Sequence, residues 1–219
     1  MAELGALTLY VAGLGRCGTT LVMRMLAAGG APVAGEAPAF ERYTHNELAA
    51  PATLAEARGH AVKVIDPQRL GFFHPLFDLR PRHAILLSRD TAEQAKSQIH
   101  FVRSLQEAAS VAAGAGPRLY TGAQPGNREM RRTLTARLVR DQKAAQDTLR
   151  KANVAFTPLA FERILAKPEE VAAIIAFQLR PWWRLDAAAM AATVIRRDPA
   201  WSGTLDLESA EAFAKEAGL

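Results

Sequence analysis

The feature that most constrains the fold of this chain is the glycine-rich segment GLGRCGTT at residues 13–20. It follows a short apolar run, LTLYVA at residues 7–12, whose β-branched and aromatic content is typical of a buried strand. Residues 19–28 then repeat apolar side chains at helical spacing before two glycines end the pattern. Glycines let successive N–H groups turn inward, and a helix amino terminus adds its positive end. This order of strand, loop and helix predicts an anion-binding loop.

The rest of the chain indicates an α/β fold with a parallel sheet flanked by helices. Short apolar runs bounded by proline, glycine or polar residues predict three more strands, at residues 61–65, 83–88 and 154–161. Helical patterns cover residues 91–109 and 127–151, and a further helix begins at Pro168. No internal repeat, low-complexity linker or shift in composition divides the sequence. We therefore expect one domain over residues 1–219.

Composition excludes several classes of protein. With 49% hydrophobic and 22% charged residues, the chain of 219 residues has the make-up of a globular protein rather than a disordered, collagenous or coiled-coil one. It has one cysteine, Cys17, which excludes an internal disulfide. No apolar run approaches the roughly 20 residues that cross a bilayer, and no signal peptide is evident. We expect a cytoplasmic protein with no membrane partner. A net charge of +5 favours anionic ligands and is too small to indicate nucleic acid.

The loop departs from the phosphate-binding loop of nucleotide triphosphatases at an informative position. In the pattern G-x-x-x-x-G-K-[ST], the lysine binds the β- and γ-phosphates. Here Thr19 stands at the lysine position, Thr20 takes the hydroxyl position, and Arg16 lies inside the loop. An R-x-G-T-T loop of this kind resembles the cofactor loop of sulfotransferases that use 3′-phosphoadenosine 5′-phosphosulfate (PAPS), in particular the branch that includes tyrosylprotein sulfotransferases.

Two more segments resemble the same family. Its second signature is an arginine at the end of a strand followed eight residues later by a serine on a helix, and LLSRDTAEQAKSQ supplies Arg89 and Ser97. A later segment, TPLAFERILAKPEEV, resembles the family's last strand, turn and helix, with Phe161-Glu162 in place of Tyr-Glu. The resemblance covers most of residues 7–178, and the carboxyl-terminal part does not align.

The resemblance implies a fold, a reaction and a set of site residues. The fold is the sulfotransferase variant of the P-loop nucleoside-triphosphate-hydrolase architecture. The reaction moves a sulfuryl group from PAPS, as co-substrate and without a metal, to a hydroxyl-bearing small molecule, carbohydrate or peptide. Glu36, which follows the first helix in a Gly-Glu context, corresponds to the catalytic base. The residues expected to bind the cofactor are Gly15, Arg16, Cys17, Gly18, Thr19, Thr20, Arg89 and Ser97, the last two at its 3′-phosphate.

Other residues leave alternatives open. Lys63, at the end of a predicted strand, lies either beside the transferred group or in solvent, and we count it with Arg16 and Glu36 as catalytic. Glu41 is the substitute for Glu36. Cys17 has no evident histidine partner, so we expect it to fill the loop rather than to act as a nucleophile. The five histidines show no metal-ligand spacing, so no metal site is expected.

Two rival functions remain at this point. One is a P-loop kinase of a small molecule or nucleic acid, in which Asp66, after AVKVI, would bind a metal ion. The missing loop lysine counts against it. The other is a nucleotide-binding module without catalysis.

Overall fold

In the computed structural model, the residues described are 6–37, 40, 47–112 and 127–194. The chain forms two compact units, of which the first comprises residues 1–89 and 139–195 and the second residues 90–138 and 196–219. The described part of the second unit consists of helix α4 (Thr91–Ala112) and the first half of helix α5 (Asn127–Lys151). The expectation of a single domain over residues 1–219 stays a prediction.

The first unit holds four strands and a set of mostly short helices. The strands are β1 (Thr8–Gly13), β2 (Ala61–Ile65), β3 (Arg82–Ser88) and β4 (Phe156–Ala160). The α-helices are α1 (Thr19–Ala28), α2 (Pro51–Ala57), α3 (Pro67–Leu70), α6 (Phe161–Ala166), α7 (Pro168–Leu179) and α8 (Ala187–Ala192), together with the second half of α5. Two 3₁₀ turns, η1 (Glu47–Ala49) and η2 (Pro75–Asp78), lie between them in sequence.

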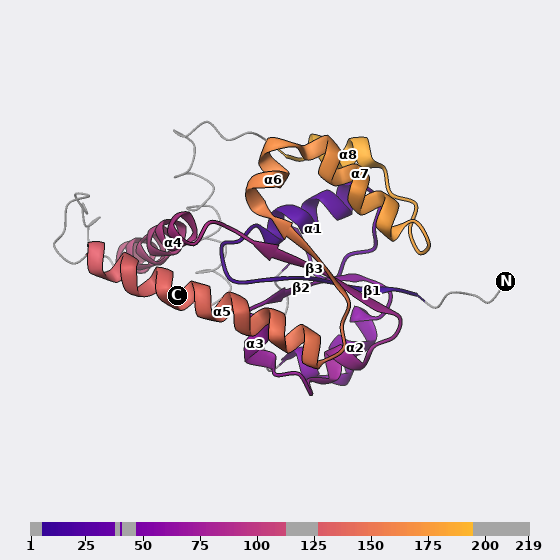
Figure 1. The fold of residues 1–219 in the computed structure, drawn as a ribbon, viewed down its shortest axis with the longest axis horizontal. Helices are drawn as coiled ribbons and strands as arrows, with labels where there is room; N and C mark the ends of the chain where they lie inside the picture. Colours follow the sequence, from indigo (N-terminus) through magenta and orange to yellow (C-terminus); the bar gives the residue numbers. More distant parts are fainter. Residues whose placement is uncertain (1–5, 38–39, 41–46, 113–126, 195–219) are drawn as a thin grey trace. The chain divides into compact units, whose positions relative to one another are not determined.

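The four strands form one parallel sheet in the order β2-β1-β3-β4, which confirms the predicted α/β fold class (Figure 1). Gly13, the last residue of β1, is in register with Ile65 of β2 and Leu87 of β3. Ser88 at the end of β3 is in register with Ala160 at the end of β4. The carboxyl ends of all four strands therefore lie along one edge of the sheet.

Both faces of the sheet are buried by helices, as near-continuous apolar strands require. On one face, β1 residues Leu9 and Val11 belong to a core with α1, α6, α7 and α8. On the other, Tyr10 and Ala12 belong to a core with α2, η2 and the end of α5. Figure 1 shows α1, α7 and α8 together on the first face and α2 and α3 on the second. Alternate β1 side chains thus face opposite cores, as the pleat of a strand dictates.

Several predicted elements agree closely with those observed. The helix at residues 19–28, the strand at 61–65 and the helix at 127–151 have the bounds expected from sequence. The predicted loop at residues 114–126 lies outside the described part of the chain. Among the described helices, none has both the length and the apolar character needed to cross a membrane.

Candidate active site

The glycine-rich loop lies where a parallel sheet usually binds its ligand. Strand β1 is central, and the chain passes to β2 on one side of it and to β3 on the other. At such a reversal of strand order, ligands bind outside the carboxyl ends of the strands. The loop follows β1 at this edge, and Arg89 directly follows β3. We take this edge of the first unit as the candidate active site.

The loop backbone has an unusual conformation at two residues. Arg16 has φ 67° and Gly18 has φ 99°, both in the left-handed region. Glycine adopts this region readily, whereas it costs a residue such as arginine roughly 1–2 kcal/mol. The N–H of Cys17 donates to the carbonyl of Leu14 at 3.2 Å, which closes the turn. Strained backbone of this kind tends to occur at functional sites, so these two φ angles make the loop a candidate for one.

Gly18 also lacks space for a side chain. A Cβ atom at this position would lie 2.4 Å from Cδ2 of Phe161, the residue that follows β4. The ring of Phe161 therefore packs directly on the loop backbone just before α1. The positive φ of residue 18 and the close approach of the Phe161 ring both require glycine at this position.

We expect Gly18→Ala to weaken the binding of adenosine 3′,5′-bisphosphate by about tenfold or more, since strain of this kind costs roughly 1–3 kcal/mol and the ring must also move. Calorimetric titration measures the effect. Gly30→Ala is the matched control, because Gly30 has φ 87° with open space around it and lies past the far end of α1. The double variant Gly18→Ala, Phe161→Ala separates the steric clash from the backbone strain. If binding recovers in the double variant, the clash caused the loss; if binding does not recover, the strained φ of residue 18 caused it. Normal binding by Gly18→Ala would show that the loop does not hold the ligand.

Arg89 links the loop to the end of β4. Its Nη1 donates to the carbonyl oxygen of Arg16 at 3.1 Å, and its guanidinium carbon lies 4.8 Å from the centre of the Phe161 ring. Such stacking of a guanidinium on an aromatic ring contributes about 0.5–1 kcal/mol at exposed positions and more when it is desolvated. The arginine is thus held on two sides at the edge where an anion would bind.

Lys63 brings a positive charge to the start of α1 from the neighbouring strand. Its side chain is 8% exposed, and its Nζ donates to Oγ1 of Thr20 at 2.7 Å. The lysine on β2 faces α1 because Val62 and Val64 point to the opposite core. Lys63 is therefore not in solvent but lies beside Thr20 in the first turn of α1. Its catalytic role stays a prediction.

The thiol of Cys17 is turned into the core rather than toward the edge. Its side chain is 1% exposed, and its Sγ occupies the space beside Gly13. Burial raises the pKa of the Cys17 thiol to about 12. A contact of Cys17 with an anion would therefore involve its backbone and not its sulfur. A buried, protonated thiol agrees with the expectation that Cys17 fills the loop.

We expect Cys17 in the folded protein to resist alkylation by iodoacetamide at pH 8, because the thiolate is the reactive form and burial opposes both ionisation and access. Labelling followed by mass spectrometry checks this, with the urea-unfolded protein as the positive control. Modification of the native chain as fast as of the unfolded chain would contradict the buried placement.

Glu36 lies on a segment that runs beside β2. The segment is anchored where Val33 bridges Ala61 and where the N–H of Ala34 donates to the Ala61 carbonyl at 2.9 Å. The Glu36 side chain is exposed and has no side-chain hydrogen bond or ion pair to another described residue. The structure therefore shows no hydrogen bond or ion pair between the Glu36 side chain and the loop. Glu41, its substitute, lies outside the described residues.

Ser97, the second half of the arginine–serine signature, lies on α4 in the second unit and is half-buried. Its role at a 3′-phosphate stays a prediction. The cofactor-binding roles of Gly15 and Thr19 also stay predictions. Gly15 belongs to the loop and Thr19 to the first turn of α1, and the structure places both segments at the carboxyl ends of the strands.

Asp66, the carboxylate that a kinase would use, has a structural partner. It follows β2 with φ 52°, and its N–H donates to the carbonyl of Gly13 at 2.9 Å. Its side chain forms an ion pair with Arg69 at 3.3 Å. Among the described residues, no group of three or more metal-ligating side chains is close enough to hold a metal ion.

Phe161 is the site residue whose role the sequence did not indicate. The sequence matched it only as part of a strand and turn. The strand order is what indicates a place for Phe161 in the site. Arg89 follows Ser88, Phe161 follows Ala160, and Ser88 and Ala160 are in register on neighbouring strands. Once β3 and β4 are known to be neighbours, the two side chains are expected to meet.

Comparisons with known proteins add little to this description. No family model matches the chain, and no curated protein matches it in sequence. Among solved structures, it is similar to the crystal structure of a sulfotransferase from Alicyclobacillus acidocaldarius, at 16% identity and a TM-score of 0.47. That similarity covers 94% of this chain and 95% of the other. At this identity and TM-score the likeness carries no argument, and what the chain does rests on its own residues.

Proposed function

We propose that the protein is a sulfotransferase that moves a sulfuryl group from PAPS to a hydroxyl acceptor. The observation that carries this proposal is the contact between the two signature arginines: Arg89 donates to the carbonyl of Arg16 at 3.1 Å at the end of the sheet. In sequence these residues lie far apart, and each was assigned to PAPS from a separate motif. Their contact supports one anion site that uses both.

Different residues of the loop and of the neighbouring strands would bind different groups of PAPS. Backbone N–H groups near Gly18 and the hydroxyl of Thr20 would bind the 5′-phosphate at the amino terminus of α1. Lys63, already bonded to that hydroxyl, adds a charge near the bridging oxygen between phosphorus and sulfur. Arg89 would bind the 3′-phosphate. The cofactor thus requires no lysine within the loop, which accounts for threonine at position 19.

The transfer needs a base for the acceptor and positive charge for the leaving group. The acceptor oxygen attacks sulfur, the bond between sulfur and the 5′-phosphate oxygen breaks, and the acceptor's proton passes to the carboxylate of Glu36. Negative charge builds on the leaving phosphate. Arg16 stabilises the charge on the sulfuryl group in transfer and, together with Lys63, the charge on the leaving phosphate, so adenosine 3′,5′-bisphosphate departs as an anion.

A direct test compares two donors. We expect the purified protein to transfer ³⁵S from labelled PAPS, without added metal, to at least one acceptor in a panel of a phenol, an aliphatic alcohol, a sugar and a tyrosine peptide. It should not transfer ³²P from γ-labelled ATP with magnesium to the same panel. Transfer of phosphate alone would establish the kinase instead. Tight binding of the bisphosphate without any turnover would favour the binding module without catalysis.

A further inference from the structure

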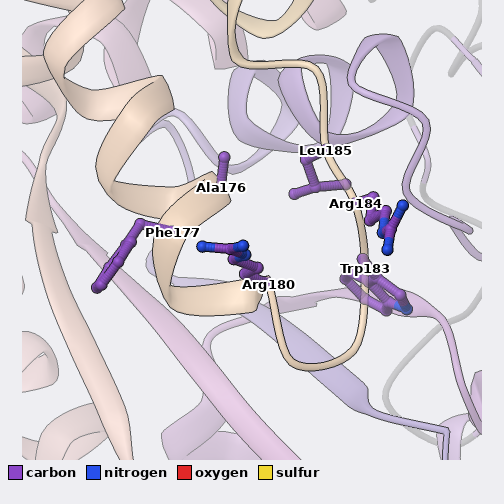
Figure 2. Close-up of a pocket in the computed structure, with 6 residues that line it drawn as sticks. All are labelled: Ala176, Phe177, Arg180, Trp183, Arg184 and Leu185. Carbon is purple, nitrogen blue, oxygen red and sulfur yellow. The ribbon is translucent and has the colours of Figure 1, made fainter.

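An open hollow lies at the end of α7, away from the glycine-rich loop. It has a volume of about 610 Å³, within the range of small-molecule sites. Figure 2 shows that part of its lining comes from α7 and the remainder from the turn that follows. The lining residues are Ala176, Phe177, Arg180, Trp183, Arg184 and Leu185.

Two positive charges line this hollow without an ion-pair partner among the described residues. Neither Arg180 nor Arg184 forms an ion pair or a side-chain hydrogen bond with another residue that the structure describes. Arginines at a helix end often bind its last carbonyls, but these two do not. The adjacent carboxylate, Asp186, instead accepts from the N–H of Ala189 at 3.0 Å and caps α8.

Other basic side chains on α6 and α7 behave differently. Arg163 and Lys167 both bind the carboxylate of Glu170, at 2.5 and 3.0 Å. Glu170 lies at the opposite end of α7 from the hollow. Glu170 thus pairs with basic side chains at one end of α7, whereas Arg180 and Arg184 at the other end form no ion pair with a described residue.

Aromatic surface accompanies the two charges. Phe177 is 75% exposed, although phenylalanine is normally buried. The ring of Trp183 packs partly against the core and also lines the hollow. Flat apolar surface beside guanidinium groups is suited to a ring that carries an anionic group, since the ring can stack while the anion binds the planar donors.

The hollow is remote from the candidate active site. The N–H of Asp186, which follows the lining residues, donates to the carbonyl of Gly29 at the carboxyl end of α1. The glycine-rich loop lies at the amino end of α1, and a helix of 10 residues is about 15 Å long. A ligand in the hollow is therefore separate from the reacting group.

We propose that this hollow is a second ligand site, which binds a small molecule that combines an aromatic ring with an oxyanion, such as an aryl sulfate, aryl sulfonate or aryl phosphate. The oxyanion binds Arg180 and Arg184, and the ring lies against Phe177 and Trp183. This inference does not depend on the reaction proposed for the loop.

Equilibrium dialysis with naphthalene-1-sulfonate tests the proposal on the full chain. We expect wild type to bind this probe. It should bind methanesulfonate, which lacks the ring, and the neutral naphthalene-1-sulfonamide, which lacks the negative charge, at least about tenfold more weakly. Arg180→Ala and Arg184→Ala should each lose about tenfold in affinity, and Phe177→Ala should also lose affinity. Arg58→Ala, at an exposed arginine before β2, is the matched control and should bind normally.

Two further measurements separate this site from the loop. Saturating adenosine 3′,5′-bisphosphate should leave probe binding unchanged, and so should Arg16→Ala. Thermal unfolding of each variant confirms that the exposed substitutions leave the fold intact. The proposal is overturned if wild type does not bind the probe, if both arginine variants bind it as wild type does, or if the bisphosphate displaces it.

Discussion

Glu36→Gln is expected to slow sulfuryl transfer by about 10²–10⁴-fold, which is the usual loss when a general base is removed. The substitution keeps the shape of the side chain but removes its basicity. Affinity for adenosine 3′,5′-bisphosphate should be nearly unchanged, since a general base acts on the acceptor hydroxyl and is not expected to contact the cofactor. Initial rates with ³⁵S-labelled PAPS and calorimetric titration give the two quantities separately.

Glu41→Gln is the internal control for this experiment, and its rate should stay within a fewfold of wild type. If Glu36→Gln keeps its activity and Glu41→Gln loses it, the base is Glu41. If neither substitution matters, no carboxylate of this segment accepts the proton. Either outcome contradicts the assignment of Glu36, which the structure leaves exposed beside β2.

Arg16→Ala is expected to lower the turnover number by about 10²–10³-fold, the loss typical of removing one donor to a developing negative charge. Binding of the bisphosphate should fall much less, because that product lacks the sulfuryl group that we propose Arg16 contacts in the transition state. Arg16→Lys should recover part of the rate, since it keeps a charge but loses the planar donor pair.

Equal losses in turnover and in product affinity would make Arg16 a phosphate-binding residue with no special role in transfer. The variant Arg16→Gly separates the effect of the arginine side chain on turnover from the effect of the strained backbone. Arg16 has φ 67°, which glycine adopts without strain, so Arg16→Gly removes the guanidinium while relaxing the loop. A variant that binds product normally and turns over slowly would support the transition-state role.

The strand, loop and helix at residues 8–28 could be predicted from sequence because each carries a strong local signal. The run in β1 is mostly apolar and fully buried, the glycines are closely spaced, and Gly29 ends α1. The parallel sheet was predictable for a similar reason, since its short strands are apolar on both faces. Helices such as α3, with four residues, and α8, with six, are too short to show a helical period.

The arrangement of the site was less predictable, because it depends on strand order. Alternation along β2 leaves Lys63 either beside the transferred group or in solvent, and only the packing of α1 over β2 shows that it is buried beside Thr20. The contact of Phe161 with Gly18 joins residues that are far apart in sequence. The hollow at the end of α7 depends on how the turn after Pro181 folds back to α1, and that segment has no regular pattern.

The most direct test of the central claim is a calorimetric titration of wild type and Arg89→Ala with adenosine 3′,5′-bisphosphate, adenosine 5′-phosphate and ATP with magnesium. Wild type should bind the bisphosphate much more tightly than either of the others, without metal. Arg89→Ala should lose about ten- to a hundredfold for the bisphosphate, as expected for a charge-assisted contact of roughly 1.5–3 kcal/mol, and little for adenosine 5′-phosphate. Equal affinity of wild type for the two adenosine phosphates, or tighter binding of ATP with magnesium, would contradict a PAPS-dependent enzyme.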